Sequence, residues 1–266
     1  MQEQFVINTT TDFDSSVCTL ALLVGNDYFS YAVSDDKNNV IVLKRYYLQN
    51  TGTKQLDDIL QLNNVLSENF ANIVTAFDFN SNTLLPVDLN TGDHTSLLYL
   101  NDAAQQDHIM YEVVKDWQLS NVYSIPYSLL NWVLGHFPSS KFWHAQSVQI
   151  QNAGKENING GIHLDVRDKN FNVTVTLHDK LLLAQTYPYT TPSDVLFYLL
   201  KICEGFGLAQ DSVQLTISGL IDKNSALFKT LYDYFLNIDM KSATWKPDEY
   251  PAHYFTLLNQ VALCES

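Results

Sequence analysis

Positive charge is scarce in this sequence. Lysine and arginine together number 15 against 29 aspartates and glutamates, the formal net charge is −14, and only Arg45 and Arg167 carry a guanidinium. Nucleic-acid binding needs clustered lysine and arginine side chains that neutralise phosphates, and no segment supplies such a cluster. An anionic membrane surface is disfavoured for the same reason. The composition therefore excludes nucleic acid as a partner and suits a basic protein partner.

Long apolar runs are also missing. The first residues, MQEQFVINTTTDFDSS, have neither the basic start nor the apolar stretch of a secretory signal, and no later run approaches the length of a membrane span. We therefore expect a cytoplasmic protein without direct membrane insertion. Cysteine is limited to Cys18, Cys203 and Cys264, each among apolar neighbours, which predicts buried free thiols rather than a disulfide or a metal site.

The short signatures of common catalytic sites are absent as well. Gly160 and Gly161 are the only adjacent glycines, and they lack the following Lys and Ser or Thr of a P-loop. No Gly-x-Ser-x-Gly motif occurs. Histidine pairs such as His163 and His178 lack the spacing of metal ligands. These patterns predict no catalytic residue and no metal site.

What the chain does contain is one pattern written twice. Residues 23–48 and 165–189 each predict three successive strands with apolar side chains at alternate positions. These alternating residues are Phe29, Tyr31 and Val33 in the first segment and Phe171, Val173 and Val175 in the second. The repetition indicates an internal duplication, and a cleft between two similar lobes is a common place to bind a ligand.

A helix and a further strand follow each of these segments. Thr53 is a candidate cap for the first helix, and residues 72–79 are predicted as the next strand. In the second half, Thr191 and Pro192 predict a capped helix that stops at 205–207. Strand 213–217 and another helix come next, so each half has the order β-β-β-α-β-α.

The predicted domain organisation follows from this order. We assign residues 1–17 to an N-terminal extension, 18–155 to the first lobe and 156–266 to the second. The boundary falls in the polar, glycine-containing segment 151–161. The first lobe carries an insertion at 84–114 that the second lacks.

The end of the insertion predicts a β-hairpin. Strand 109–114 is expected to turn at Lys115 and Asp116 into a second strand, 118–125. A helix that begins at Tyr127 is expected directly afterwards.

The whole order resembles the actin-like ATPase fold, an α/β, duplicated ribonuclease-H-like arrangement with a mixed sheet in each lobe, shared by actin, sugar kinases and the 70-kDa heat-shock chaperones. The Leu-Leu-Pro of 84–86, the hairpin and the Ile-Pro of 125–126 are most similar to the pilus-assembly and secretion-platform group. Over nearly its full length the chain also resembles an uncharacterised family of Bacteroidota proteins of unknown function.

In that superfamily three turns hold ATP with Mg, and the resemblance carries them onto seven residues of this chain. The matching positions are Gly25 and Asn26, then Asp165, Arg167 and Asp168, and finally Ser218 and Gly219. Leu23 stands where a metal-side carboxylate belongs, and Arg167 stands where glycine lets amides face a phosphate. Leu220 adds bulk beside the third turn. For Asp165 two readings stay open, a surviving functional carboxylate or a structural one that pairs with Arg167.

Two functions are compatible with these residues. The first is a degenerate actin-like protein, a non-catalytic binding or scaffold module for a protein partner, with no cofactor. The second is a nucleotide-binding ATPase or kinase in which Asp165, Asp168 and Gly219 still hold ATP with Mg. Fold alone does not choose between them, because one frame hosts many activities.

Overall fold

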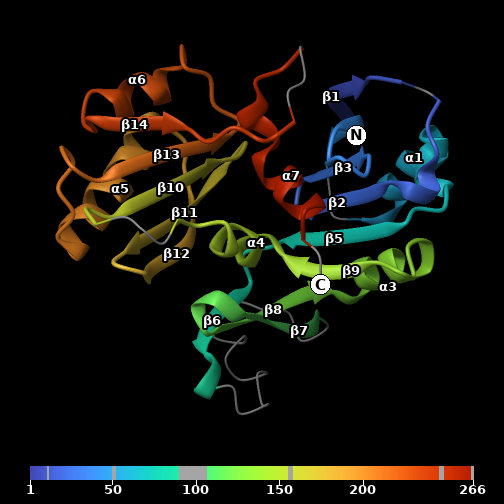
Figure 1. The fold of residues 1–266 in the computed structure, drawn as a ribbon, viewed down its shortest axis with the longest axis horizontal. Coiled ribbons are helices and arrows are strands. Elements are labelled where there is room, and N and C mark those ends of the chain that lie inside the picture. The colour runs from blue at the N-terminus through green and yellow to red at the C-terminus, as the bar shows by residue number, and fades with distance from the viewer. Residues whose placement is uncertain (11, 50–51, 90–106, 155–157, 246–248, 265–266) are drawn as a thin grey trace. The chain divides into compact units, whose positions relative to one another are not determined.

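The computed structural model describes residues 1–266 except 11, 50–51, 90–106, 155–157, 246–248 and 265–266 (Figure 1). The chain divides into two compact units, Met1–Val148 with Leu258–Ser266, and Gln149–Leu257. These bounds differ from the predicted lobes mainly at the C-terminus. There the end of the chain groups with the first unit, where Asn259 lies within 3.5 Å of Asn38.

The first unit is built on a six-stranded sheet with the order β1-β4-β3-β2-β5-β9. The strands are β1 (Gln2–Asn8), β2 (Thr19–Gly25), β3 (Tyr28–Ser34), β4 (Val40–Tyr47), β5 (Asn72–Asp78) and β9 (Lys141–His144). The predicted N-terminal extension contains β1, which pairs antiparallel with β4 over most of its length. Residues 2–8 of this predicted extension therefore add a strand at the edge of the sheet.

Helices α1 (Thr53–Leu62) and α3 (Tyr127–His136) cover one face of this sheet. Phe29, Tyr31 and Val33 of β3 are fully buried against them, as their alternate spacing predicts. Burying one such side chain contributes about 1.5 to 3 kcal/mol. The proposed cap at Thr53 is wrong in detail, because the cap position is Gly52 and no side-chain hydrogen bond is made there.

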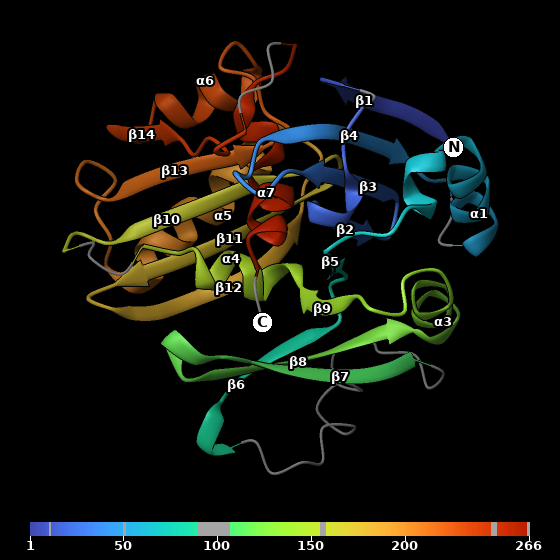
Figure 2. The ribbon, with the colours of Figure 1, turned by 45° about the vertical axis from the view of Figure 1, so that its right-hand side comes forward.

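A second, three-stranded sheet of the first unit comprises β6 (Asn82–Pro86), β7 (Asp107–Val114) and β8 (Leu119–Pro126) (Figure 2). The predicted hairpin is confirmed, since β7 and β8 pair antiparallel across a short 3-10 turn, Lys115–Trp117. Most of the rest of the insertion, 90–106, lies outside the described residues.

The second unit is a five-stranded sheet with the order β12-β11-β10-β13-β14. Its strands are β10 (Gly161–Val166), β11 (Asn170–Leu177), β12 (Lys180–Pro188), β13 (Gln214–Gly219) and β14 (Asn237–Met240). Helices α5 (Pro192–Phe206) and α6 (Ala226–Tyr232) pack on the apolar face formed by side chains such as Leu164 and Val173. Two further helices, α4 (Ala145–Gln151) and α7 (Thr256–Ala262), occupy the chain at the two junctions between units.

The two sheets confirm the duplication. Leaving out β1, the first reads β4-β3-β2-β5-β9 and the second β12-β11-β10-β13-β14, so corresponding strands occupy corresponding places. The directions agree too, because β2 and β10 each pair antiparallel with the following strand and parallel with the strand after the helix. One folding unit has therefore been used twice.

The start of α5 has the predicted capping box. The Asp194 carboxylate accepts hydrogen bonds from the amides of Thr190 at 2.9 Å and Thr191 at 2.7 Å, which satisfies donors that precede the first helical turn. Hydrogen bonding by these amides lowers the pKa of Asp194. At the other end Gly207 adopts a left-handed conformation, φ +66°, as a C-terminal cap.

All three cysteines are free and buried, as predicted. Burial raises the pKa of the Cys203 thiol to about 11 and that of Cys264 to about 12, so neither is a reactive thiolate at neutral pH. In the part of the chain that the structure describes, no helix combines the length and apolar character needed to cross a membrane.

Candidate functional site

The first candidate turn, Gly25 and Asn26, joins β2 to β3 in the first unit. The ring of Tyr28 packs directly on Gly25, so closely that a Cβ added at Gly25 would collide with it. Asn26 is exposed at the tip of the turn. Glycine suits this position because the Tyr28 ring, from the same hairpin, fills the space beside the Gly25 backbone.

Tyr28 is held in place by two further contacts within the first unit. Its hydroxyl donates to Oδ2 of Asp78, the last residue of β5, and Asp78 lies opposite Gly25 in the parallel register. The guanidinium carbon of Arg45 lies 3.9 Å from the centre of the Tyr28 ring, a cation–π contact. Tyr28 and Asp78 were not singled out from the sequence. The turn is therefore packed and hydrogen-bonded within its own unit.

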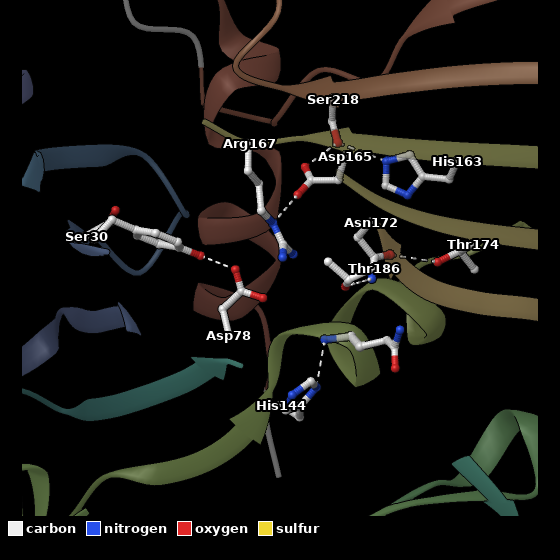
Figure 3. A network of polar contacts seen from close by, with 12 residues as sticks. Ser30, Asp78, His144, His163, Asp165, Arg167, Asn172, Thr174, Thr186 and Ser218 are labelled. Carbon is white, nitrogen blue, oxygen red and sulfur yellow. Dashed lines mark hydrogen bonds and ion pairs between the residues drawn. The ribbon is translucent and has the colours of Figure 1, made fainter. Parts of the chain in front are cut away.

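The second candidate turn follows β10 in the second unit. Both oxygens of Asp165 are engaged: Ser218 Oγ donates to Oδ1 at 2.8 Å, and Arg167 Nε donates to Oδ2 at 3.3 Å (Figure 3). Asp165 and Arg167 are 4% and 7% exposed. Of the two readings stated for Asp165, the structure shows the geometry of the structural one, a buried ion pair with Arg167.

The backbone of this turn is closed as a tight hairpin. The amide of Arg167 donates to the carbonyl of Asn170 at 2.9 Å, and the hydroxyl of Tyr189 donates to the Arg167 carbonyl at 2.8 Å. None of residues 165–168 has a positive φ. A concave nest of successive amides, which binds anions elsewhere, needs such conformations. Asp168 projects into solvent from the same turn.

The third candidate turn ends β13, beside the second. Ser218 pairs in register with Asp165 and Gly219 with Val166 along the parallel strands. Gly219 has φ +84°, and a Cβ there would collide with the carbonyl oxygen of Val166. The structure thus brings Asp165, Arg167, Ser218 and Gly219 together at one edge of the second unit, while Gly25 and Asn26 belong to the first.

The polar cluster also includes His163, which the sequence pattern predicts not to be a metal ligand. Nε2 of His163 lies 3.0 Å from Ser218 Oγ, which extends the chain of contacts to His163, Ser218, Asp165 and Arg167. Burial, and secondarily the nearby Lys241, lower the pKa of His163 to about 3, so the ring is neutral at physiological pH. Among the described residues, no group of three or more His, Cys, Asp or Glu side chains is arranged to hold a metal ion.

Comparison with solved structures places this arrangement in a fold class. The chain is similar to a protein from Bacteroides thetaiotaomicron with an actin-like ATPase fold and unknown function, with a TM-score of 0.79 and 17% identity over 94% of this chain and 97% of that one. The protein has the actin-like ATPase fold. The profile of the family described as "Protein of unknown function (DUF3822)" matches residues 8–238, and the chain belongs to that family.

Two further structures are similar at lower identity. A chain of the PilM–PilN type IV pilus biogenesis complex aligns with a TM-score of 0.62 and 10% identity, covering 92% of this chain and 97% of that one. The cytoplasmic domain of EpsL, an inner membrane component of the type II secretion system of Vibrio cholerae, aligns with a TM-score of 0.50 and 13% identity, covering 92% and 94%. A comparison with curated protein sequences finds no match.

Proposed function

We propose that this chain is a non-catalytic actin-like module that acts as a scaffold for a protein partner. The observation that carries the proposal is the Tyr28 ring, which occupies the space over Gly25 where the superfamily would place a phosphate. Its hydroxyl is bonded to Asp78 and its face to Arg45, so moving the ring aside would break both contacts. In this proposal the first turn therefore packs against Tyr28 and does not bind a phosphate.

The second turn supports the same proposal. Its only guanidinium, that of Arg167, pairs through Nε with the Asp165 carboxylate, and the amide of Arg167 donates to the Asn170 carbonyl. Phosphate binding would need amides pointed outward or a free cation. Together with Leu23 in place of a metal-side carboxylate, these contacts favour the scaffold over ATP with Mg as a cofactor.

The similar structures add support for a protein partner. One belongs to the PilM–PilN type IV pilus biogenesis complex and another to a type II secretion system. By extension we propose that this chain also works inside a protein assembly, in the cytoplasm. Three free thiols suit that reducing compartment.

An exposed apolar segment of the second unit is the contact surface that we propose. Tyr232 at the end of α6, Tyr234 and Leu236 are 62%, 51% and 74% exposed within one short stretch of chain. Clustered exposed aromatic and aliphatic side chains mark protein contacts more often than lone ones do. Because the chain carries a net charge of −14, a basic partner would be steered towards it.

Photo-crosslinking in cells tests this proposal. Benzoylphenylalanine at Tyr234, a conservative aromatic replacement, should give one discrete adduct whose second protein is basic and is identified by mass spectrometry. The same residue at the exposed Lys201 of α5 is the matched control and should give no such adduct. Equal labelling at both positions, or no adduct at Tyr234 in the full-length protein, would contradict the proposed surface.

Nucleotide titration provides a separate prediction. Isothermal titration with Mg-ATP and with ADP should show no binding up to about 1 mM, either for the natural chain or for Tyr28→Phe. The Phe variant keeps the ring over Gly25 and removes only the hydrogen bond to Asp78. Micromolar binding that Asp165→Ala weakens by about tenfold would instead favour the nucleotide-binding ATPase or kinase.

A further inference from the structure

A cavity of about 370 Å³ is lined by residues of the second unit, and its wall has both polar and apolar surface. Six of the residues that line it carry polar side chains used below: His163, Thr174, Thr176, Gln214, Thr216 and Lys241. The histidine, threonine and glutamine side chains come from the sheet face opposite the apolar core, and Lys241 follows the C-terminal end of β14. The turn residues Arg167, Asp168 and Gly219 do not line it. This volume falls in the range of small-molecule sites, roughly 300 to 1,000 Å³.

Lys241 supplies the positive charge of the cavity. Among the residues that the structure describes, its Nζ donates one hydrogen bond, to the carbonyl of Asn152 at 2.9 Å, and an ammonium has three donors. Two donors therefore remain for a bound molecule. Burial lowers the pKa of Lys241, while the carboxylate of Asp165 acts in the opposite direction. A half-buried ammonium of this kind gains from an anionic ligand because water solvates it incompletely.

His163 supplies a hydrogen-bond acceptor, and the contacts of its neighbours show which ring nitrogen accepts. The Asp165 carboxylate only accepts hydrogen bonds, so the Ser218 hydroxyl donates its one proton to Asp165 (Figure 3). Ser218 Oγ must then accept from His163, which puts the ring proton on Nε2. Nδ1 of the neutral ring is left as an acceptor, and His163 lines the cavity whereas Ser218 does not.

The remaining lining groups are hydroxyls and amides. Thr174 and Thr176 of β11 lie at alternate positions, so their side chains share the face of the sheet that carries His163. Thr216 of β13 is the register partner of His163. The hydroxyls of Thr174 and Thr176 already donate, to Oδ1 of Asn172 at 3.5 Å and to the Gly154 carbonyl at 3.0 Å. Their oxygens remain as acceptors for the hydroxyl groups of a ligand, which a bare hydrophobic molecule does not supply.

We propose that this cavity binds a small hydroxylated organic anion, with its carboxylate or phosphate on Lys241 and a hydroxyl donating to Nδ1 of His163. Such binding goes beyond the scaffold function, since it needs neither a bound nucleotide nor the Tyr232–Leu236 surface. The protein would then bind a protein partner as a scaffold and a small anion in this cavity.

Calorimetric titration of the full-length chain tests this proposal with four probes. D-Gluconate carries hydroxyls and a carboxylate, glucose 6-phosphate carries hydroxyls and a phosphate, glucose lacks the charge, and inorganic phosphate lacks the carbon-bound hydroxyls. We expect gluconate or glucose 6-phosphate to bind with a dissociation constant below about 1 mM, and glucose and phosphate to bind at least about tenfold more weakly. The preferred anion distinguishes a sugar acid from a sugar phosphate.

Two variants assign the contacts. Lys241→Met keeps the side-chain length and removes the charge, so binding of the preferred anion should weaken by about tenfold or more, whereas Lys223→Met, at an exposed lysine outside the cavity, should leave it unchanged. His163→Gln can keep a donor towards Ser218 but loses the acceptor at the Nδ1 position. It should weaken the preferred anion and leave the weak binding of inorganic phosphate unaltered.

The proposal fails if neither hydroxylated anion binds at about 10 mM, or if Lys241→Met binds as tightly as the natural chain. Far-ultraviolet circular dichroism and the urea denaturation midpoint of each variant are compared with those of the natural chain, to check that the variant is folded. The crosslinking and nucleotide experiments above do not depend on this cavity, so their failure and the failure of this proposal are distinguishable.

Discussion

Gly219→Ala is expected to lower the free energy of unfolding of the second unit by roughly 2 to 6 kcal/mol, the sum of backbone strain and overpacking. At φ +84° an alanine is strained in any surroundings, and its Cβ would meet the backbone of Val166. That backbone cannot retreat freely, since the Leu220 amide donates to the Val166 carbonyl at 2.7 Å. Urea denaturation, followed by hydrogen exchange of the β10 amides, measures the loss.

Two other glycines of the same unit separate strain from crowding. Gly207 also has a positive φ, +66°, but nothing lies within 4 Å of its added Cβ, so Gly207→Ala should cost only about 1 to 2 kcal/mol. Gly205 lies within α5 with equally open space and no positive φ, so Gly205→Ala should be neutral or stabilise by about 0.5 to 1 kcal/mol.

These three alanine variants test why position 219 is a glycine. In the resemblance to nucleotide-binding relatives this glycine would let a nucleoside approach. The structure gives it a reason that involves no ligand, the close approach of β10 and β13 at the Val166 carbonyl. A loss for Gly219→Ala no greater than that for Gly207→Ala would remove this reason and reopen the ligand reading.

The central strands could be predicted from the sequence because their partners are close in the chain. Strands β2, β3 and β4 follow one another through short turns, and the alternation of residues such as Phe29 and Tyr31 reports a buried face directly. The repeat in β10, β11 and β12 made the duplication visible. Turn and cap residues such as Thr191 and Pro192 added the helix ends.

The edge strands β1, β9 and β14 were missed for a physical reason. The pairing of β1 with β4 joins Ile7 to Leu43, far apart in sequence, and no local pattern encodes that partner. Strands β9 and β14 have four residues each, too few for an alternation to stand out. The C-terminal residues were assigned to the second lobe, because a local pattern gives no indication of the unit to which a segment belongs.

The candidate turns were found through the resemblance, but the contacts that fill them were not. Tyr28 reads as an ordinary strand residue, and only the folded hairpin shows its ring on Gly25. Its hydrogen-bond partner Asp78 is the last residue of β5, 50 positions later in the chain. His163 reads as one polar residue in an alternating strand, and its link to Ser218 depends on the parallel pairing of β10 with β13. Long-range register, which sequence alone does not display, determined the contacts of Asp78 and His163.

Asp165→Ala is expected to lower the free energy of unfolding by about 3 to 5 kcal/mol, the usual cost of removing one partner of a buried ion pair. The variant deprives Arg167 of the carboxylate 3.3 Å away and takes from Ser218 the acceptor of its hydroxyl proton. Both side chains stay buried, so water does not readily replace what is lost. Urea denaturation of the second unit provides the measurement.

A double variant distinguishes a structural role of Asp165 in the ion pair from a role in binding a ligand. Asp165→Leu with Arg167→Met removes both charges at similar volume, and replacing a buried pair in this way is often neutral or stabilising, so most of the stability lost in Asp165→Ala should return. Asp165→Asn, which keeps an acceptor for Ser218 but not the charge, should fall between the two. A functional carboxylate held at the expense of stability predicts the opposite sign for the single variant, because its removal relieves strain or repulsion. If Asp165→Ala unfolds at higher urea than the natural chain, Asp165 is kept for a ligand, and the scaffold reading loses the support of its second turn.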